Sequence, residues 1–196
     1  MTSKAYILDQ IRTNIAKQNT TQVALPDLEI AHDDYHDKDK QFAQALQSVG
    51  GMAHWLDTQE NIETFIQEHY QHHGTIATSM DLQIEHINPN DVQDPHELKN
   101  VDLAVVKGEF AVAENAAVWL QDHENINRSL YFIAQRLLIV VKKEHIVASM
   151  HEAYEQINFK ENTFGTFISG PSKTADIEQA LVIGAHGAME CMVLFI

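Results

Sequence analysis

Apolar side chains recur along this chain with two spacings, one typical of helices and the other of buried strands. At residues 3–18, Ile7, Ile11 and Ile15 return every fourth position, which predicts an amphipathic helix. A similar spacing predicts a second helix around residues 42–49, which Gly50 and Gly51 end. Further helices are predicted at residues 60–70, 127–135, 143–157 and 174–181.

Short apolar runs separate these helices and predict strands. They lie at residues 52–56, 75–80, 103–106, 116–120, 137–141, 164–169 and 192–196. The run at 137–141 is apolar at every position, which is typical of a parallel strand buried on both faces. Short strands that alternate with helices predict an α/β fold with a mainly parallel sheet.

The segment that joins the first helix to the alternating part is polar. Residues 19–40 carry Pro26, many Thr, Asp and His residues, and little apolar periodicity. We therefore expect an N-terminal helix and acidic linker at residues 1–40 and an α/β domain at residues 41–196. A chain of 196 residues is long enough for one sizeable core and short for two.

Composition narrows the classes of function. The chain has 28 Asp and Glu residues against 13 Lys and Arg, a formal charge of −15. Such a surface repels phosphate backbones, which argues against nucleic-acid binding. Cys191 is the only cysteine, so neither a disulfide framework nor a cysteine-ligated iron–sulfur cluster held by this chain alone is expected. We expect no signal peptide and no membrane span, and hence a cytoplasmic protein.

One strand-turn-helix segment carries candidate anion-binding groups. Gly170 permits a tight turn after the strand at 164–169, and Ser172 or Thr174 can cap the following helix. Free N–H groups at the helix start, together with Lys173, predict a cradle for a carboxylate or phosphate. An ordinary capped helix, with Asp176 placed to favour the helix dipole, explains the same residues.

Two further residues are candidates for acid–base chemistry. Glu114 lies among small residues, and a partly buried carboxylate has a raised pKa and serves as base, nucleophile or hydrogen-bond donor. A surface glutamate is the alternative. His186 lies between Gly184 and Gly187, where it can act as a hydrogen-bond donor or as an acid or base. A histidine in a helix-ending turn is the alternative.

Twelve histidines raise the question of a metal. His32 and His36, and the group His69, His72 and His73, have spacings that a helix could bring to one metal ion. The first pair lies in the acidic linker, the second group lies at a polar helix end, and neither matches His-Glu-x-x-His. The sequence therefore favours no metal site.

The C-terminal half resembles a known family. Residues 168–187 read ISGPSKTADIEQALVIGAHG and closely resemble the signature of the lactate-utilisation protein C family, which consists of the LUD domain and is also called YkgG-like. Residues 110–117, FAVAENAA, are similar to its middle motif, Phe-Ala-Ile-Ala-Glu-Thr-Gly-Thr. Glu114 matches that motif, whereas Asn115, Ala116 and Ala117 replace Thr-Gly-Thr. The resemblance extends from about Asp102 to Ile196.

The resemblance implies a fold, a role and partners. The fold would be an open Rossmann-like sheet similar to the NagB/RpiA/CoA-transferase group, here with an N-terminal helical extension. The role would be in a three-component system that oxidises L-lactate to pyruvate, with the iron–sulfur clusters in partner proteins. This component would bind no cofactor itself.

Two other functions remain open. The chain could be a stand-alone enzyme of the CoA-transferase-like fold that acts on a carboxylate, sugar-phosphate or acyl-CoA ligand, with Glu114 as the reactive carboxylate. It could also be a paralogue that kept the fold and lost the activity. For a lactate-oxidising component and for a stand-alone enzyme alike, we expect the site beyond the carboxyl ends of the strands. There residues 170–176 would meet the loop around Glu114, and His186 would lie behind the helix that follows the turn.

Overall fold

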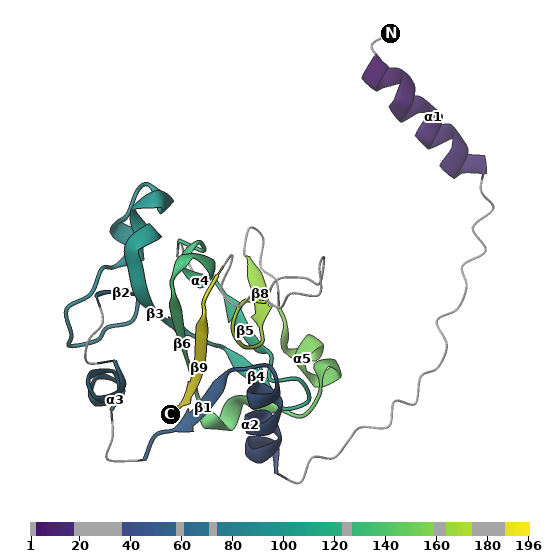
Figure 1. Cartoon of the computed structure of the whole chain (residues 1–196). Coiled ribbons are helices and arrows are strands. Elements are labelled where there is room, and N and C mark those ends of the chain that lie inside the picture. The colour runs from purple at the N-terminus through teal and green to yellow at the C-terminus, as the bar shows by residue number, and fades with distance from the viewer. Residues whose placement is uncertain are drawn as a thin grey trace. The chain divides into compact units, whose positions relative to one another are not determined.

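A computed structural model describes residues 3–17, 37–57, 61–70, 74–122, 127–158, 164–173 and 187–196 (Figure 1). Contacts divide the chain into two units, residues 1–31 and 32–196. In the first unit, α1 (Ser3–Lys17) is the helix expected from the isoleucine spacing. Its isoleucines Ile7, Ile11 and Ile15 are exposed. Among the described helices, none has the length and apolar character needed to cross a bilayer.

The second unit is built on a five-stranded sheet whose strands are all parallel, as the alternating pattern predicted. From one edge to the other the strands are β1 (Met52–Trp55), β9 (Glu190–Phe195), β6 (Arg136–Val141), β3 (Val101–Lys107) and β2 (Thr75–Thr78). Since β1 and β2 are the two edges, the connection between them crosses a whole face of the sheet. That connection contains α3 (Ile62–His69).

A second, four-stranded sheet was not predicted. Its order is β7 (Ile146–Val147), β4 (Phe110–Val112), β5 (Val118–Gln121) and β8 (Gly165–Ile168). β4 pairs in parallel with β7, whereas β5 is antiparallel to both β4 and β8. The sheet therefore joins segments that are far apart in sequence, and β8, expected as part of the one parallel sheet, belongs here instead.

The helix predicted at residues 143–157 is wrong over its first half. The segment instead forms the short 3-10 helix η3 (Lys143–His145), then β7, then α5 (Met150–Gln156). Ile146 and Val147 pair with β4 and are buried, and Ser149 caps α5 by accepting from the Glu152 N–H. Tyr154 of α5 is 65% exposed.

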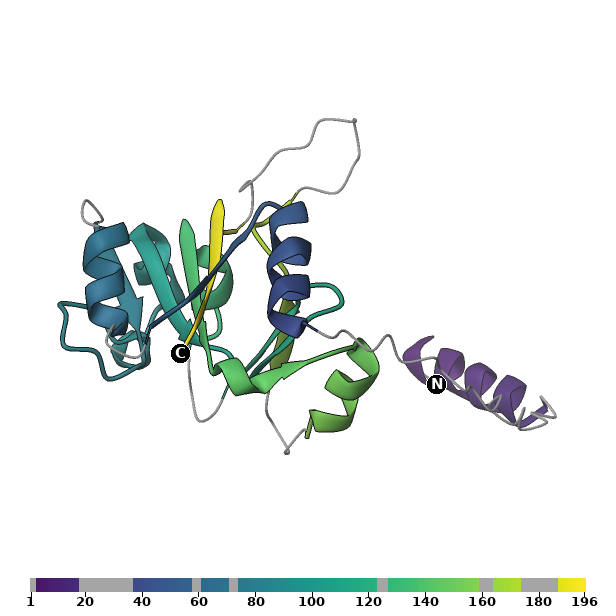
Figure 2. The same cartoon turned by 90° about the horizontal axis from the view of Figure 1, so that it is seen from below.

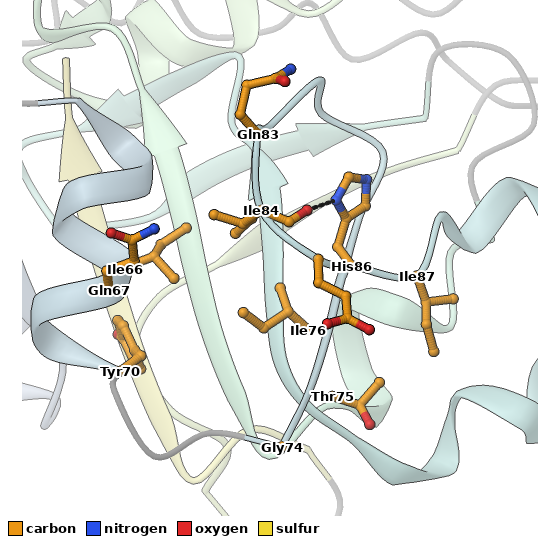
Figure 3. A pocket seen from close by; sticks show the side chains of 11 residues that line it. Ile66, Gln67, Tyr70, Gly74, Thr75, Ile76, Gln83, Ile84, His86 and Ile87 are labelled. Carbon is orange, nitrogen blue, oxygen red and sulfur yellow. Dashed lines mark hydrogen bonds between the residues drawn. The ribbon is translucent and has the colours of Figure 1, made fainter.

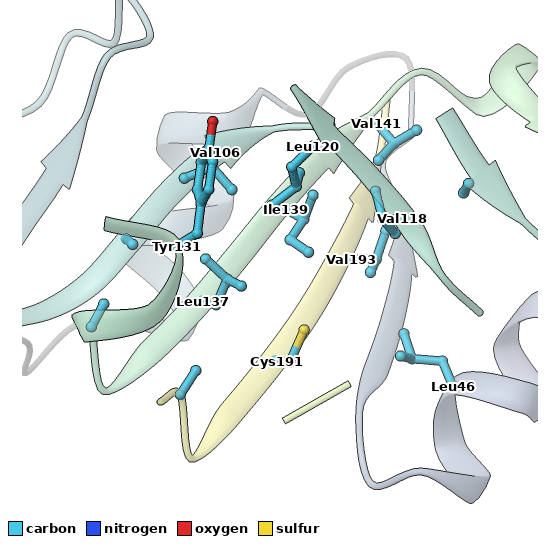
Figure 4. Packing of buried hydrophobic residues seen from close by; sticks show 14 of the residues in the cluster. Leu46, Val106, Val118, Leu120, Tyr131, Leu137, Ile139, Val141, Cys191 and Val193 are labelled. Carbon is cyan, nitrogen blue, oxygen red and sulfur yellow. The ribbon is translucent and has the colours of Figure 1, made fainter. Parts of the chain in front are cut away.

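The two sheets and three helices form layers. α2 (Lys38–Ser48) and α3 lie on opposite faces of the parallel sheet, as Figure 2 shows. The main core fills the space between the two sheets and α2 (Figure 4). It includes Leu46, Val118, Leu120, Leu137, Ile139, Cys191 and Val193. α5 packs on the other face of the small sheet, where Ala153 joins Phe110, Val112 and Trp119.

The end of α2 is fixed by a pair of glycines, as predicted. Gly50 has a φ of +85°, and its N–H donates to the Gln47 carbonyl. The Gly51 N–H donates to the Leu46 carbonyl, which completes a Schellman motif. The chain then enters β1 directly, so this ending sets where the edge strand begins.

Three short helices complete the described fold. They are η1 (Pro89–Asp91), η2 (Pro95–Asn100) and α4 (Leu130–Ile133). The helix expected at 127–135 is thus confirmed only as the four residues of α4. Leu98 of η2 and Leu130 of α4 both enter the main core.

Candidate functional site

The glycine turn, residues 170–173, follows β8 and is closely packed. Gly170 has a φ of +75°, and a Cβ there would lie 2.8 Å from Val49 Cγ2. The Ser172 N–H donates to the Ala188 carbonyl at 2.8 Å. This N–H group is therefore engaged within the protein and cannot also cradle an anion. The predicted anion cradle loses this donor.

The turn also lies at a different end of the parallel sheet from the one expected. Val49 and Ala188, which it contacts, stand just before β1 and β9 begin. The turn is therefore at the amino ends of these strands, and its predicted place beyond their carboxyl ends is wrong. The reason is that β8 belongs to the small sheet, so the loop after it opens toward the start of β9.

Glu114 is exposed, which corrects the expectation of a partly buried carboxylate. Its Oε2 accepts from the Met150 N–H at 2.8 Å, and its own N–H donates to the Ala148 carbonyl at 3.1 Å. A carboxylate at the first residue of a helix satisfies an unpaired N–H and favours the helix dipole. Glu114 thus ties the β4–β5 loop to the start of α5.

The loop after Glu114 keeps a tight turn although it lacks the family's glycine. Ala116 is buried with a φ of +55°, in the left-handed region that glycine adopts more easily. The Asn115 side chain accepts from the Ala117 N–H at 3.1 Å and so closes the turn. The Ser169 hydroxyl donates to the Asn115 carbonyl at 2.8 Å. The two segments expected to meet are therefore joined at this hydrogen bond.

Of the remaining predicted site residues, the structure describes Ser172 and Lys173. Lys173 is exposed and Ser172 is half-buried. Gly187 packs closely against Ser172, because a Cβ on Gly187 would lie 3.0 Å from the Ser172 Cβ. Thr174, Asp176 and His186 lie outside the described residues. Their roles stay predictions.

A cavity does lie at the carboxyl ends of the parallel strands. This carboxyl-edge cavity has a volume of about 440 Å³. Its walls come from the ends of β1, β2, β6 and β9 and from the start of α3. The lining residues are Leu56, Asp57, Asn61, Ile62, Glu63, Met80, Asp81, Leu82, Lys143 and Ile196. This is the place where open parallel sheets bind ligands most often.

Polar groups of both signs face this cavity. The Asn61 side-chain oxygen accepts from the Thr64 N–H at 2.7 Å and caps α3, which leaves the amide NH2 as a donor. Lys143 brings an ammonium group, and the N-terminus of α3 brings positive partial charge. Asp57 and Asp81 bring acceptors. The cavity can therefore bind a small molecule that carries both an anionic group and hydroxyl donors.

A larger open groove runs along β2 and has a volume of about 880 Å³. In this β2-edge groove, Ile66 and Gln67 of α3 and Tyr70, which caps its C-terminus, lie across from the loop at residues 83–87 (Figure 3). The His86 Nδ1 bonds to the Ile84 carbonyl at 2.8 Å. Burial raises the pKa of Tyr70 to about 12, so this phenol stays protonated at neutral pH. Ile87 pairs with β2 through two backbone hydrogen bonds and covers part of that edge.

A third pocket, of about 370 Å³, lies over the small sheet. Phe110 and Trp119 form its apolar side, and His145 and Glu109 stand at its rim. Since Phe110 and Trp119 are both almost fully buried, their rings offer little surface for stacking. It offers fewer charged side chains to a ligand than the carboxyl-edge cavity does.

No group of three or more His, Cys, Asp or Glu side chains suited to a metal is found among the described residues. Burial raises the pKa of the Cys191 thiol to about 12, although the Gly170 N–H acts in the opposite direction. A thiol must lose its proton to hold iron or zinc, so Cys191 is poorly suited to ligate either.

Sequence reasoning missed the residues of the carboxyl-edge cavity. Asp57 and Lys143 each stand within two residues of a strand's end, and Asn61 precedes an apolar helical run. The signal that could have found them is their position directly after a strand, where parallel sheets bind their ligands. The same rule pointed to residues 170–176 instead, because the strand before them was expected in the parallel sheet and belongs to the small one.

Comparisons with known proteins agree with this fold. A family model described as LUD domain matches residues 95–196. Lactate utilization protein C of Bacillus pumilus (strain SAFR-032) is 33% identical over 99 residues, which are 47% of this chain and 41% of the relative. The protein of the same name from Geobacillus kaustophilus (strain HTA426) is 32% identical over 103 residues, which are 50% of this chain and 42% of the relative. The matches thus span less than half of these relatives.

A solved structure extends the likeness to most of the chain. It is the crystal structure of a DUF162 family protein from Deinococcus radiodurans, with a TM-score of 0.64 at 16% sequence identity. The match covers 81% of this chain and 96% of the other, and it shows the shared fold. With more than half of its residues matched by the family model, the chain belongs to the LUD domain family.

Proposed function

We propose that this chain is a component of a lactate-utilisation system that oxidises L-lactate to pyruvate. The observation that carries the proposal is the 33% identity, over 99 residues, to a protein named Lactate utilization protein C. The LUD domain match, residues 95–196, contains most of the residues of the two-sheet core. We place the component in the cytoplasm.

In this proposal the iron–sulfur clusters belong to partner proteins. The chain has one cysteine, which is buried and has a raised thiol pKa, whereas a cluster needs several thiolate ligands. The chain then contributes substrate binding or assembly, and electrons leave through the partners.

We place the substrate in the carboxyl-edge cavity. A 2-hydroxy acid carries a carboxylate, for which Lys143, the Asn61 amide and the start of α3 offer donors. It also carries a hydroxyl donor, which Asp57 or Asp81 can accept. The three carboxylates of the lining disfavour a ligand with more than one negative charge.

The alternative of a stand-alone enzyme with Glu114 as nucleophile has less support. The Glu114 carboxylate is exposed and is bonded to the Met150 N–H. It is also absent from the linings of the three cavities above. A nucleophile needs a substrate held beside it, and none of these three cavities would hold one beside Glu114.

Growth and binding test the proposal together. We expect deletion of the gene to abolish growth on L-lactate as sole carbon source, and the wild-type chain to restore it. Calorimetry with the purified chain should detect L-lactate or pyruvate, and Lys143→Ala should weaken binding about tenfold or more. Lys142→Ala is the matched control, since Lys142 is also exposed but does not line the cavity.

Two results would count against the proposal in different ways. Normal growth of the deletion strain on L-lactate would remove the role in lactate utilisation. Equal binding by wild type, Lys143→Ala and Lys142→Ala would remove the cavity as the substrate site. Anaerobic purification adds a third measurement, in which iron should accompany the partners and not the isolated chain.

A further inference from the structure

Two histidines from different elements meet on the α3 side of the parallel sheet. His54 lies on β1 and His69 lies in the last turn of α3. Their ring centroids are 5.9 Å apart, with an angle of 53° between the rings. Both rings also contact Phe65, His69 at 4.1 Å and His54 at 4.8 Å between centroids. The tertiary structure thus pairs His69 with a residue 15 positions earlier.

The His69 ring is held in one chemical form. Its Nδ1 lies 3.0 Å from the Phe65 carbonyl oxygen. A carbonyl only accepts, so in this contact Nδ1 carries the proton, and the Nε2 of the neutral ring keeps its lone pair. Histidines that bind metals commonly use the same device, with one nitrogen bonded to a carbonyl and the other free to ligate.

The separation of the rings fits a shared metal ion. Metal–nitrogen bonds of about 2.0–2.1 Å put each ring centroid about 3.2 Å from the metal. Two rings at angles between tetrahedral and linear then have centroids about 5.2–6.4 Å apart. The observed 5.9 Å lies inside that range.

We propose that His54 and His69 form a two-imidazole site for a borderline divalent metal ion such as Zn²⁺, Ni²⁺ or Cu²⁺. Imidazole favours these ions over Mg²⁺ and Ca²⁺, which prefer oxygen ligands. Water fills the other coordination positions. The bound ion joins edge strand β1 to α3, the two elements whose ends also line the carboxyl-edge cavity. This site is independent of the proposed role in lactate utilisation.

A purely structural role is the competing explanation, since both rings cover Phe65. Substitution by phenylalanine separates the two, because a phenyl ring keeps the stacking area and has no nitrogen to ligate. The variants are therefore His54→Phe, His69→Phe and the double variant. The control is His96→Phe, since His96 has a side chain that is 90% exposed and bonds to Asp94.

The experiment measures the melting temperature of the full chain after chelator treatment, with Zn²⁺, Ni²⁺ or Mg²⁺ added. At about 100 times the dissociation constant, Zn²⁺ or Ni²⁺ should raise the melting temperature by about 5–10 °C, and Mg²⁺ should not. Each single Phe variant should lose most of that rise, and the double variant should lose no more, because one ion needs both rings. His96→Phe should keep the rise.

Two results would overturn the site. One is the absence of any rise with Zn²⁺ or Ni²⁺ in the wild type. The other is an undiminished rise in the Phe variants, which would place the binding at other histidines. Circular dichroism without metal checks that each variant is folded. Where a Phe variant fails that check, the corresponding Gln variant takes its place with the same expected loss.

Discussion

The glycine turn and the carboxyl edge of the parallel sheet contrast sharply. The turn carries the motif most like the family signature, its Ser172 N–H is bonded within the protein, and Gly170 packs closely against Val49. The carboxyl edge carries no such motif, yet it holds a cavity of about 440 Å³ with charged groups of both signs. A family signature can therefore mark how the chain is packed, while the ligand is bound elsewhere.

The same contrast follows the boundary of the family match. The LUD domain model begins at residue 95, yet eight of the ten residues around the carboxyl-edge cavity precede it, with Lys143 and Ile196 the exceptions. Every residue lining the β2-edge groove precedes it as well. Similarity in the matched half thus supports the fold more directly than the ligand. The following predictions test whether the turn is structural and the carboxyl edge is not.

The largest effect is expected at Gly170. Gly170→Ala should lower the free energy of unfolding by about 2–4 kcal/mol, because alanine is strained at positive φ and its Cβ would meet Val49. Gly50→Ala is the matched control. Gly50 also has a positive φ, but its Cβ would meet only Pro171 Cγ at 3.6 Å, so about 1–2 kcal/mol is expected. Equal losses in urea titrations would show that packing against Val49 contributes nothing.

Alkaline pH should lower the stability of the chain through the buried Cys191 thiol, which lies in the main core beside the glycine turn. The Cys191 thiol has a pKa of about 12 in the folded chain and about 9 when unfolded, so above pH 9 the unfolded state loses this proton first. The free energy of unfolding should therefore fall by about 2–3 kcal/mol between pH 9 and pH 11 from this group. Tyr70 and Tyr131, whose pKa values burial also raises to about 12, add to the fall above pH 10.

Cys191→Ala isolates the thiol in that experiment. The variant should show a shallower fall of stability between pH 9 and pH 10, measured by urea unfolding at each pH. An unchanged slope of stability against pH would mean that solvent reaches the Cys191 thiol and the core beside the glycine turn.

A smaller effect is expected at the hydrogen bond that joins the turn to the loop after β4. Ser169→Ala removes the hydroxyl that bonds to the Asn115 carbonyl and should cost about 0.5–1 kcal/mol. Ser48→Ala removes a hydroxyl that bonds to Ala45 within its own helix, and should change stability by less than about 0.5 kcal/mol. If the two variants unfold at the same urea concentration, the link between the two segments is not stabilising.

The smallest change in stability is expected at the carboxyl edge. Lys143→Ala should change the free energy of unfolding by less than about 0.5 kcal/mol, because this side chain is exposed. A loss above about 1 kcal/mol in a urea titration would instead make Lys143 part of the structure. The comparison would then fail, because both regions would be structural.

Much of the fold could be predicted from local patterns. The spacing of Phe42 and Leu46 followed by two glycines predicted α2 and its end, and the apolar run at 137–141 predicted a buried parallel strand. These predictions are confirmed because helix spacing, a left-handed glycine and burial on both faces each depend on residues close in sequence. The glycine turn also needed glycine for local reasons, namely its positive φ.

Other features were decided by residues that are distant in the chain. Ile146 and Val147 fit a helical spacing, but pairing with β4 draws them into a strand. The carboxyl-edge cavity gathers residues from 56 to 196, and the His54–His69 pair arises only when α3 folds onto β1. The sequence by itself determined elements such as α2 and β6, because local backbone preferences act within a few residues. Only the tertiary structure decided which strand ends, carboxylates and imidazoles share a space, because that depends on which strands pair and which faces are buried together.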